Sequence, residues 1–368
     1  MTRSEKKKRY DGMLIFVVLL LVAAGLVILY STSAYNGQVK FHDPFHYLKK
    51  QGFATLLGLF GMALIARVDY HKWVPLAIPA YVTSIILSVA VIFFGDEYNG
   101  SKRWLSLGPI SFQPSEFAKV AVIFFLACLV SRNVQRMKRF RTMILMMIPV
   151  LPIVGLVGAS NLSTAIIILG IAVVLIFVAD PKYVRFILMG SIGVGFMTVF
   201  LAMESYRLER LAIWRHPEQY EKGYQTLQGL YAIGSGGLFG RGLGNSVQKL
   251  GFLPEAQNDM IFSIICEEVG LIGAGFIILL FLILIWRFFV ISTKASDLLG
   301  ALIAAGAMAH MMIQVILNIA VVTNSIPNTG ITLPFISYGG TSVVFLLLEM
   351  GLVLSVSNYE GLRYGGSE

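Results

Sequence analysis

Long apolar stretches alternate with short polar ones along most of the 368 residues. Ten of these stretches approach the roughly 20 apolar residues that an α-helix needs to cross a bilayer. We expect a helix in each, because a helix satisfies its own backbone polar groups in lipid. The expected spans are 13–34, 51–67, 73–95, 115–131, 142–158, 162–179, 184–203, 261–286, 298–322 and 340–357. The pattern therefore predicts an all-α polytopic membrane protein with about ten transmembrane helices.

Composition supports this class and excludes others. The chain is 57% hydrophobic and 13% charged, whereas a soluble domain has roughly a quarter of its residues charged. Cys128 and Cys266 stand in apolar context, show neither a disulfide framework nor a metal-ligand spacing, and are expected to be packing residues. No Walker motif is present, which argues against an ATPase. The net charge of +9 requires no nucleic acid, because basic loops and contact with anionic lipid headgroups account for it.

The distribution of basic residues predicts the orientation in the membrane. Lysine and arginine gather in residues 1–12 and in the loop 132–141, and such clusters face the cytoplasm. Ten spans place both ends on the same side, so 1–12 and 358–368 are expected to be cytoplasmic tails. Residues 204–260 then form a large extracytoplasmic loop with short helices. We expect one membrane domain over 1–368, with its chemistry outside the cytoplasm.

The first outer segment, NGSKRWLSLGPISFQPSEFAK, ends in the start of a helix. Ser115 is expected to cap this helix, and Glu116 complements the positive end of its dipole. Lys119 lies about one turn inside the next span, where a lone cation is unfavourable. Two interpretations stay open: Lys119 pairs with Glu116 three residues earlier, or it holds a phosphate or diphosphate together with Arg103.

The large loop contains cations, aromatic residues and a glycine-rich stretch. Arg210 and Arg215 lie near Trp214 and Tyr220, a mixture that suits a headgroup anchor as well as a substrate contact. The stretch GSGGLFGRGLGNS lacks the strand and helix of a dinucleotide fingerprint. We expect a compact loop that lines a ligand site, because its glycines allow close backbone approach.

Two further outer stretches are candidates for a site. In FLPEAQNDMIF, a helix beginning near Pro254 would put Glu255 and Asp259 on one face. These acids either compensate a helix dipole or act on a substrate. In TNSIPNTGITLPFISYGGTS, proline and glycine forbid a regular helix, and Ser337 adds a hydroxyl group. Such a backbone is either a re-entrant packing loop or the lining of a wet cavity, and its contact with the acidic stretch is a hypothesis.

These motifs together resemble one family over nearly the whole chain. NGSKRWLSLGPISFQPSEFAK, AIGSGGLFGRGLGNSVQKLGFLPEAQNDMIF and PNTGITLPFISYGGTS are similar to the signatures of the SEDS proteins (shape, elongation, division, sporulation). The sequences of these motifs resemble those of the division and sporulation branch (FtsW, SpoVE) more than those of the elongation branch (RodA). The resemblance implies a peptidoglycan glycosyltransferase in the bacterial cytoplasmic membrane. Such enzymes polymerise lipid II at the outer face and release undecaprenyl diphosphate.

The resemblance also implies roles for individual residues. The essential aspartate of the family falls on Asp259, which we expect to be the general base that takes a proton from a sugar hydroxyl. Arg103 and Lys119 are the first candidates to hold the leaving diphosphate, and Arg210 and Arg215 the second. We expect Glu255 either to pair with a cation or to bind a divalent ion. No motif in the sequence indicates which, and none indicates another cofactor. Further family motif positions are Gln113, Glu116 and Ser337.

This chain departs from the family pattern in two places. Gln257, Asn258 and Met260 stand where many members have His, Thr and Phe, which argues against a mechanism that needs an imidazole at 257. Asn161 replaces an acid, which puts a metal or proton role there in doubt. Two other functions stay open: a lipid II flippase, and a scaffold for a class B penicillin-binding protein. The resemblance implies that this transpeptidase is a partner of the enzyme in any case.

Overall fold

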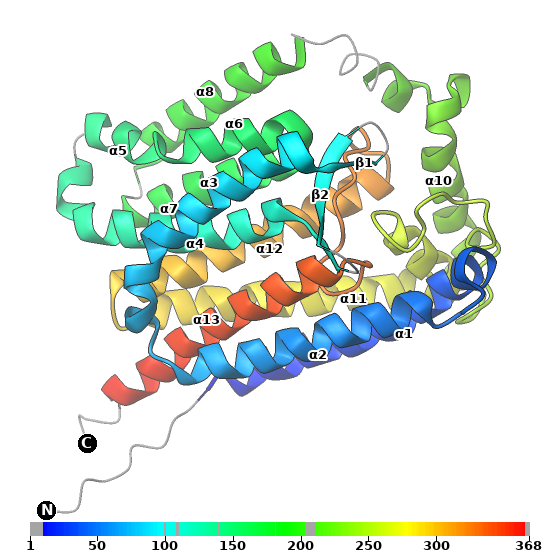
Figure 1. The fold of residues 1–368 in the computed structure, drawn as a ribbon, viewed down its shortest axis with the longest axis horizontal. Coiled ribbons are helices and arrows are strands. Elements are labelled where there is room, and N and C mark those ends of the chain that lie inside the picture. Colours follow the sequence, from blue (N-terminus) through cyan, green and yellow to red (C-terminus); the bar gives the residue numbers. More distant parts are fainter. Residues whose placement is uncertain are drawn as a thin grey trace, which may run out of the picture.

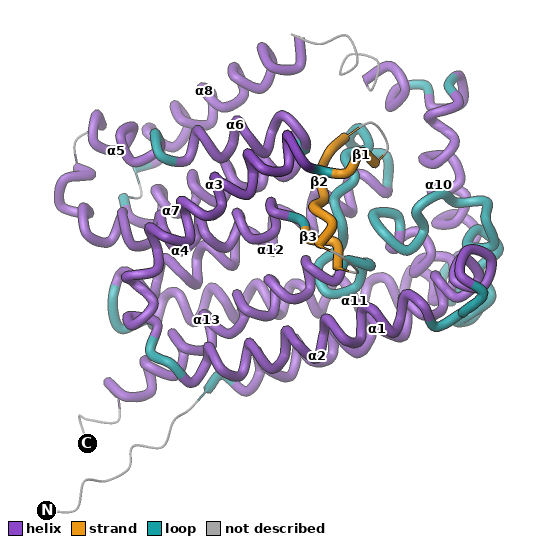
Figure 2. Tube along the Cα trace, viewed as in Figure 1, coloured by secondary structure: helices purple, strands orange, loops and turns teal. Residues whose placement is uncertain are grey.

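The computed structural model describes residues 10–98, 101–107, 110–138, 140–180, 182–202 and 211–364. Most of them form a bundle of long helices (Figures 1 and 2). The helices are α1 (Gly12–Phe41), α2 (His46–Arg67), α3 (Ala77–Phe94), α4 (Pro114–Asn133), α5 (Phe140–Met147), α6 (Val150–Ser160), α7 (Leu162–Ala179), α8 (Tyr183–Ala202), α10 (Tyr224–Gly236), α11 (Ile261–Lys294), α12 (Leu298–Val322) and α13 (Gly340–Tyr364). Short 3₁₀ helices are η1 (Tyr70–Leu76), η2 (Val134–Lys138), η3 (Pro217–Gln219) and η4 (Glu221–Gly223).

Helices cover every predicted span, with 142–158 divided between α5 and α6, so the polytopic all-α class is confirmed. Among the described residues, 7 helices are long and apolar enough to cross a membrane, or 8 when α5 and α6 count as one span bent by 42°. Helices α2 and α8, of 22 and 20 residues, also have the length that a span needs. The short helices expected between 204 and 260 are present as η3, η4 and α10, and residues 203–210 lie outside the described residues.

A small antiparallel sheet is the element that the hydropathy pattern did not predict. Its strands β1 (Asp96–Tyr98), β2 (Ser101–Leu107) and β3 (Ile110–Phe112) follow one another in the order β1-β2-β3. They join α3 to α4, and the sheet carries Arg103 on its central strand. Helix α4 then begins at Pro114, and the capping position belongs to Gln113. The expectation of a Ser115 cap is therefore wrong, because proline needs no N–H partner at the first helical position.

The two ends of the bundle differ in character. The main-chain N–H of Asp11, just before α1, donates to Ser357 Oγ of α13 over 3.3 Å, so the chain begins and ends at one end. Helix α10 and the three strands lie at the opposite end (Figure 1). The irregular segments that the sequence marks as candidates, around residues 254–260 and 323–339, are therefore far from both termini.

Helix α11 is interrupted near its start, and the glycine-rich loop forms hydrogen bonds to the backbone groups that the interruption leaves free. Gly270 has φ 67° and ψ −172°, which removes two main-chain hydrogen bonds of an ideal helix. The four freed groups are the carbonyls of Glu267 and Glu268 and the N–H groups of Leu271 and Ile272. All four bond to the segment 237–242 instead, over 2.9, 2.9, 3.0 and 3.2 Å. The loop thus satisfies backbone groups that lipid could not satisfy.

Side chains of the same two glutamates hold the rest of this loop. Lys249 Nζ lies 2.6 Å from Glu268 Oε1, and Ser31 of α1 donates to the same carboxylate over 2.8 Å. Glu267 Oε1 accepts from the main-chain N–H of Val247 over 3.1 Å. The glutamates are buried, so their role in the structure is to fasten the glycine-rich loop to α11. The prediction of a ligand-lining loop did not include this anchoring.

We expect Gly270→Ala to destabilise the protein, because the left-handed φ disfavours a side chain. Its Cβ would also lie 2.3 Å from Gly240 N and 2.5 Å from Leu238 O. Backbone strain of this kind is worth roughly 1–3 kcal/mol, so the melting temperature in detergent should fall by several degrees. The control is Gly275→Ala on the same helix, where nothing lies within 4 Å of the added carbon. Equal melting temperatures for the two variants would contradict the role of Gly270 in the contact between α11 and the segment 237–242.

Candidate active site

The acidic stretch and the irregular segment before α13 lie against each other. Three consecutive main-chain carbonyls of the acidic stretch accept hydrogen bonds from residues between 318 and 338. The carbonyl of Gln257 accepts from the N–H of Tyr338 (2.9 Å), and that of Asn258 accepts from Ser337 Oγ (2.6 Å). The carbonyl of Asp259 accepts from Asn318 Nδ2 on α12 (2.9 Å). The hypothesis that these two stretches meet is therefore confirmed, and Ser337 contributes through its contact with the main chain.

The expected helix through the acidic stretch is absent. Helix α11 begins at Ile261, and Glu255 has φ 53°, in the left-handed region. A turn replaces the helix, in which Asn258 N donates to the carbonyl of Glu255 over 2.9 Å. Glu255 still acts electrostatically on Asp259, but the shared helical face predicted for these acids is wrong.

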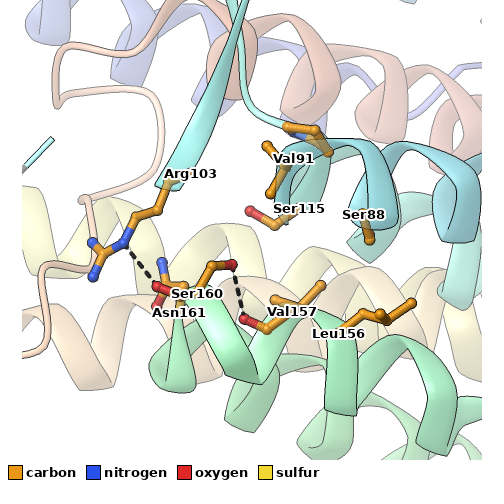
Figure 3. Close-up of a pocket in the computed structure, with 9 residues that line it drawn as sticks. Ser88, Val91, Arg103, Ser115, Leu156, Val157, Ser160 and Asn161 are labelled. Carbon is orange, nitrogen blue, oxygen red and sulfur yellow. Dashed lines mark hydrogen bonds between the residues drawn. The ribbon is translucent and has the colours of Figure 1, made fainter. Parts of the chain in front are cut away.

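Asp259 and Arg103 both lie beside Gly330. A methyl group on Gly330 would lie 3.8 Å from Asp259 Oδ2 and 3.4 Å from Arg103 Nη1, and the φ of this glycine is +69°. Arg103 reaches from β2 to α6, where its Nε donates to the carbonyl of Ser160 over 3.1 Å (Figure 3). The fold thus brings a carboxylate and a guanidinium that are distant in sequence to the same glycine.

Burial changes the acidity of Asp259. The pKa of this carboxyl group is raised from 3.8 to about 7, chiefly by desolvation. The negative charge of Glu255 contributes to this rise, whereas the positive charge of Arg103 opposes it. Asp259 lies just before α11, outside the span. A carboxylate with such a pKa suits proton abstraction near neutral pH.

Lys119 takes the ion-pair role, one of the two that the sequence left open. Its side chain is 2% exposed. Lys119 Nζ lies 2.9 Å from Glu116 Oε1 and donates to Gln314 Oε1 over 2.8 Å. The cation is thus neutralised within the bundle, and a direct contact with a diphosphate stays a prediction. Gln113 lies at the start of the same helix and makes no side-chain cap.

The second-choice arginines are not brought to Asp259 by any contact that the structure describes. Arg215 lines an open groove of about 560 Å³ with Leu211, Trp214 and Asn324. Arg210 lies outside the described residues. A separate cavity of about 10 Å³ beside Arg103, lined in part by Ser115 and Asn161 (Figure 3), has room for one water molecule.

The residues that depart from the family pattern have structural partners. Gln257 Oε1 accepts from Asn36 Nδ2 on α1 over 3.1 Å, and the Asn258 amide donates to Glu255. Asn161 caps α7, its Oδ1 accepting from Thr164 N over 3.2 Å. Within the described part of the chain, no group of three or more His, Cys, Asp and Glu side chains could hold a metal ion. Glu255 accepts a hydrogen bond from Asn258, and its pairing with a cation or a divalent ion stays a prediction.

Polar residues of α12 were missed at the level of sequence. His310, Gln314 and Asn318 are all buried and recur every four residues, so they share one face of the helix. Polar groups at helical spacing inside a span are a signal of function or of a polar partner. That signal was present in the expected span 298–322 and could have been used.

A bundle of membrane-spanning helices with a buried carboxylate at one end defines a polytopic membrane protein with a candidate acid–base site. The chain belongs to the cell cycle protein family FTSW_RODA_SPOVE, whose model matches residues 11–361.

Relatives cover almost the same length. Stage V sporulation protein E of Bacillus subtilis is 40% identical over 96% of this chain and 98% of the relative. A probable peptidoglycan glycosyltransferase FtsW of Geobacter sp. is 35% identical over 95% of this chain and 96% of the relative. The SEDS resemblance is thereby confirmed.

Solved structures share the fold. A chain from a structure described as structural coordination of polymerization and crosslinking by a peptidoglycan synthase complex superposes with a TM-score of 0.79 at 29% identity, covering 95% of this chain and 98% of that one. The rod shape determining protein RodA of Thermus thermophilus gives a TM-score of 0.70 at 29% identity, covering 95% and 96%. The same RodA was also solved as an aspartate-to-alanine mutant.

Proposed function

We propose that this protein is a peptidoglycan glycosyltransferase that polymerises lipid II into glycan strands. The observation that carries the proposal is that buried Asp259 and Arg103 both lie beside Gly330, at the end of the bundle opposite the start of α1. One group accepts a proton and the other stabilises negative charge, as glycosyl transfer from a diphosphate requires. Membership of a family with relatives named as probable peptidoglycan glycosyltransferases supports the same reaction.

In this mechanism Asp259 is the general base. A sugar hydroxyl of the acceptor attacks the anomeric carbon of the donor, and the Asp259 carboxylate takes the hydroxyl proton. The bond from the anomeric carbon to the diphosphate oxygen breaks, and undecaprenyl diphosphate leaves with the bonding electrons. A single displacement of this kind inverts the anomeric centre.

Arg103 stabilises the leaving diphosphate. Its guanidinium is permanently charged and presents several N–H donors to phosphate oxygens. The Nε bond to Ser160 helps to fix the orientation of the group, and its Nη1 lies beside Gly330. Lys119 supports this site from inside the bundle through Glu116 and Gln314.

The raised pKa of Asp259 predicts the pH dependence of the reaction. The base must be ionised, so the rate should rise with pH and reach half its maximum near the Asp259 pKa of about 7. Below that pH the rate should fall about tenfold per unit, because one proton blocks one base. Initial rates measured in detergent between about pH 5 and about pH 9 check this expectation. A rate that is constant across the interval would contradict it.

We expect Gly330→Ala to slow the reaction, because its methyl group would enter the space between Asp259 Oδ2 and Arg103 Nη1. The control is Gly244→Ala, which also has a positive φ of +86° but has nothing within 4 Å of the added carbon. Both variants bear backbone strain of about 1–2 kcal/mol, so only the filled site distinguishes their rates. Equal rates per folded molecule would argue against a substrate site at Gly330.

We also propose the orientation and the partner. Basic clusters in 1–12 and 132–141 favour a cytoplasmic location for both tails. The candidate site, at the other end, then faces the outside, where lipid II is consumed. A single-span transpeptidase of the class B penicillin-binding type is the expected partner, since a similar chain was solved within a peptidoglycan synthase complex.

The test is polymerisation of fluorescent lipid II by the purified protein in detergent, with and without a divalent ion. We expect glycan strands in the absence of any sealed membrane. A flippase has no measurable activity without two compartments, so product in detergent separates the two functions. A folded protein that yields no glycan alone or with the transpeptidase, yet moves lipid II across vesicles, would overturn the proposal.

A further inference from the structure

Asn318 connects the proposed base to the segment that carries Gly330. Its Nδ2 donates to the carbonyl of Asp259 over 2.9 Å and to the carbonyl of Ile331 over 2.7 Å. Both amide hydrogens are therefore used, one on each of the two stretches that form the site. Asn318 is fully buried, with 0% of its surface exposed, so water cannot replace these bonds without opening the bundle.

Gln314 holds the same segment one helical turn away. Its Nε2 donates to the carbonyl of Thr332 over 3.1 Å. Its Oε1 accepts from Lys119 Nζ over 2.8 Å and lies 2.9 Å from His310 Nε2. Because an oxygen that faces an ammonium group is the acceptor, Lys119 fixes which end of the Gln314 amide faces Thr332.

Behind this amide lies a buried chain of ionisable groups. His310 Nδ1 is 2.8 Å from Glu349 Oε2 on α13, and Lys119 pairs with Glu116 on α4. The position of Gln314 is thus defined by side chains from three helices. Moving Gln314 would leave buried polar groups of these helices without a hydrogen bond, so the network favours one position of its amide.

We propose that Asn318 is a positioning residue for the base Asp259, and that Gln314, oriented by Lys119, supports it by fixing the neighbouring main chain. This inference rests on the proposed function and names residues of the same site. Asn318 touches no reacting atom; it fixes the main chain of Asp259 against Ile331, and so sets the distance of the base from Gly330 and Arg103. Precise placement matters because a shift of about 1 Å can reduce an enzymatic rate by about a hundredfold.

The experiment compares Asn318→Ala with wild type in detergent, measuring kcat, KM for lipid II and the pH of half-maximal rate. We expect kcat per folded molecule to fall roughly ten- to a hundredfold, with a smaller change in KM. The pH midpoint should also move down, because a loosened Asp259 gains water and burial is the main cause of its raised pKa. The described charged groups that act on Asp259, Glu255 and Arg103, are unchanged in this variant.

The pH midpoint separates positioning from simple loss of folded protein. Loss of folded enzyme lowers the rate equally at every pH and leaves the midpoint in place. The matched control is Asn133→Ala, which removes an amide bond to the carbonyl of Leu129 (2.8 Å) at the far end of α4. This control should leave kcat and the midpoint as in wild type.

A second variant covers the case in which Asn318→Ala does not fold. Asn318→Gln keeps an amide in the core but displaces its donors by one methylene, so it should show the same fall in kcat and the same downward shift. Wild-type kcat and midpoint in either folded variant would overturn the inference while leaving the proposed function intact. A wild-type protein that makes no glycan would overturn the proposed function first, and the inference with it.

Discussion

Purified Asp259→Asn should fold, bind lipid II and make almost no glycan. The amide is nearly isosteric with the carboxyl group but cannot take a proton from the attacking hydroxyl. Removing a general base typically lowers a rate by about 10²–10⁴-fold. The loss should appear in kcat, because binding of the lipid tail and of the diphosphate does not depend on this proton.

The stability of the same variant provides a second check. The folded-state pKa of Asp259 lies above its unfolded value of 3.8, at about 7. As pH rises from about 4 to about 7, the unfolded chain loses this proton first, so ionisation destabilises the folded wild type over that window. Asn carries no such proton, so at about pH 8 the variant should melt at or above the wild-type temperature.

The control for this substitution is Asp43→Asn, which removes a more exposed carboxylate that pairs with Lys49 over 2.8 Å. It should leave both rate and pH dependence as in wild type. A folded Asp259→Asn protein that polymerises lipid II at the wild-type rate would exclude Asp259 as the base.

Arg103→Ala is the second variant with a large expected effect. Loss of the guanidinium removes the charge that stabilises the leaving diphosphate, and removal of one such preorganised donor typically costs about 10²–10³-fold in rate. It also leaves the carbonyl of Ser160 without the bond from Nε. Initial rates at saturating and at limiting lipid II measure the effect on kcat and on kcat/KM.

Arg103→Lys separates charge from shape. Lysine keeps the positive charge but lacks the planar fork of donors, so its rate should lie between those of Arg103→Ala and wild type. The adjacent Lys102→Ala is the matched control, because successive residues of a strand point to opposite faces. Equal rates for Arg103→Ala and Lys102→Ala would contradict the assignment of the leaving-group site.

Hydropathy was sufficient to predict the spans, because each is a local property of about 20 residues. The sheet escaped prediction because strands as short as β1 and β3, of 3 residues each, are too short for a clear alternation of apolar and polar residues. The expectation of a helix through the acidic stretch was wrong because Pro254 is compatible with a first turn, whereas the chain adopts a positive φ at Glu255.

The sequence predicted which residues belong to the candidate site, but it did not predict the contacts between them. Motifs single out Asp259 and Arg103, but their common position beside Gly330 depends on how α11, α12 and β2 pack, which no local pattern encodes. The Glu116–Lys119 pair was foreseeable from its spacing of three. The role of Asn318 was not, because its partners are main-chain carbonyls that any sequence would supply.

The central claim is that the carboxylate of Asp259 makes this chain a polymerase. The most direct measurement is the single-turnover rate of lipid II coupling by wild type and Asp259→Asn, each at about pH 6 and about pH 8. With a pKa of about 7, the wild-type rate should rise about tenfold between the two, because ionisation of the base follows the pH. The Asp259→Asn rate should be low and the same at both. An equal rise in the two proteins would show that another group is the base.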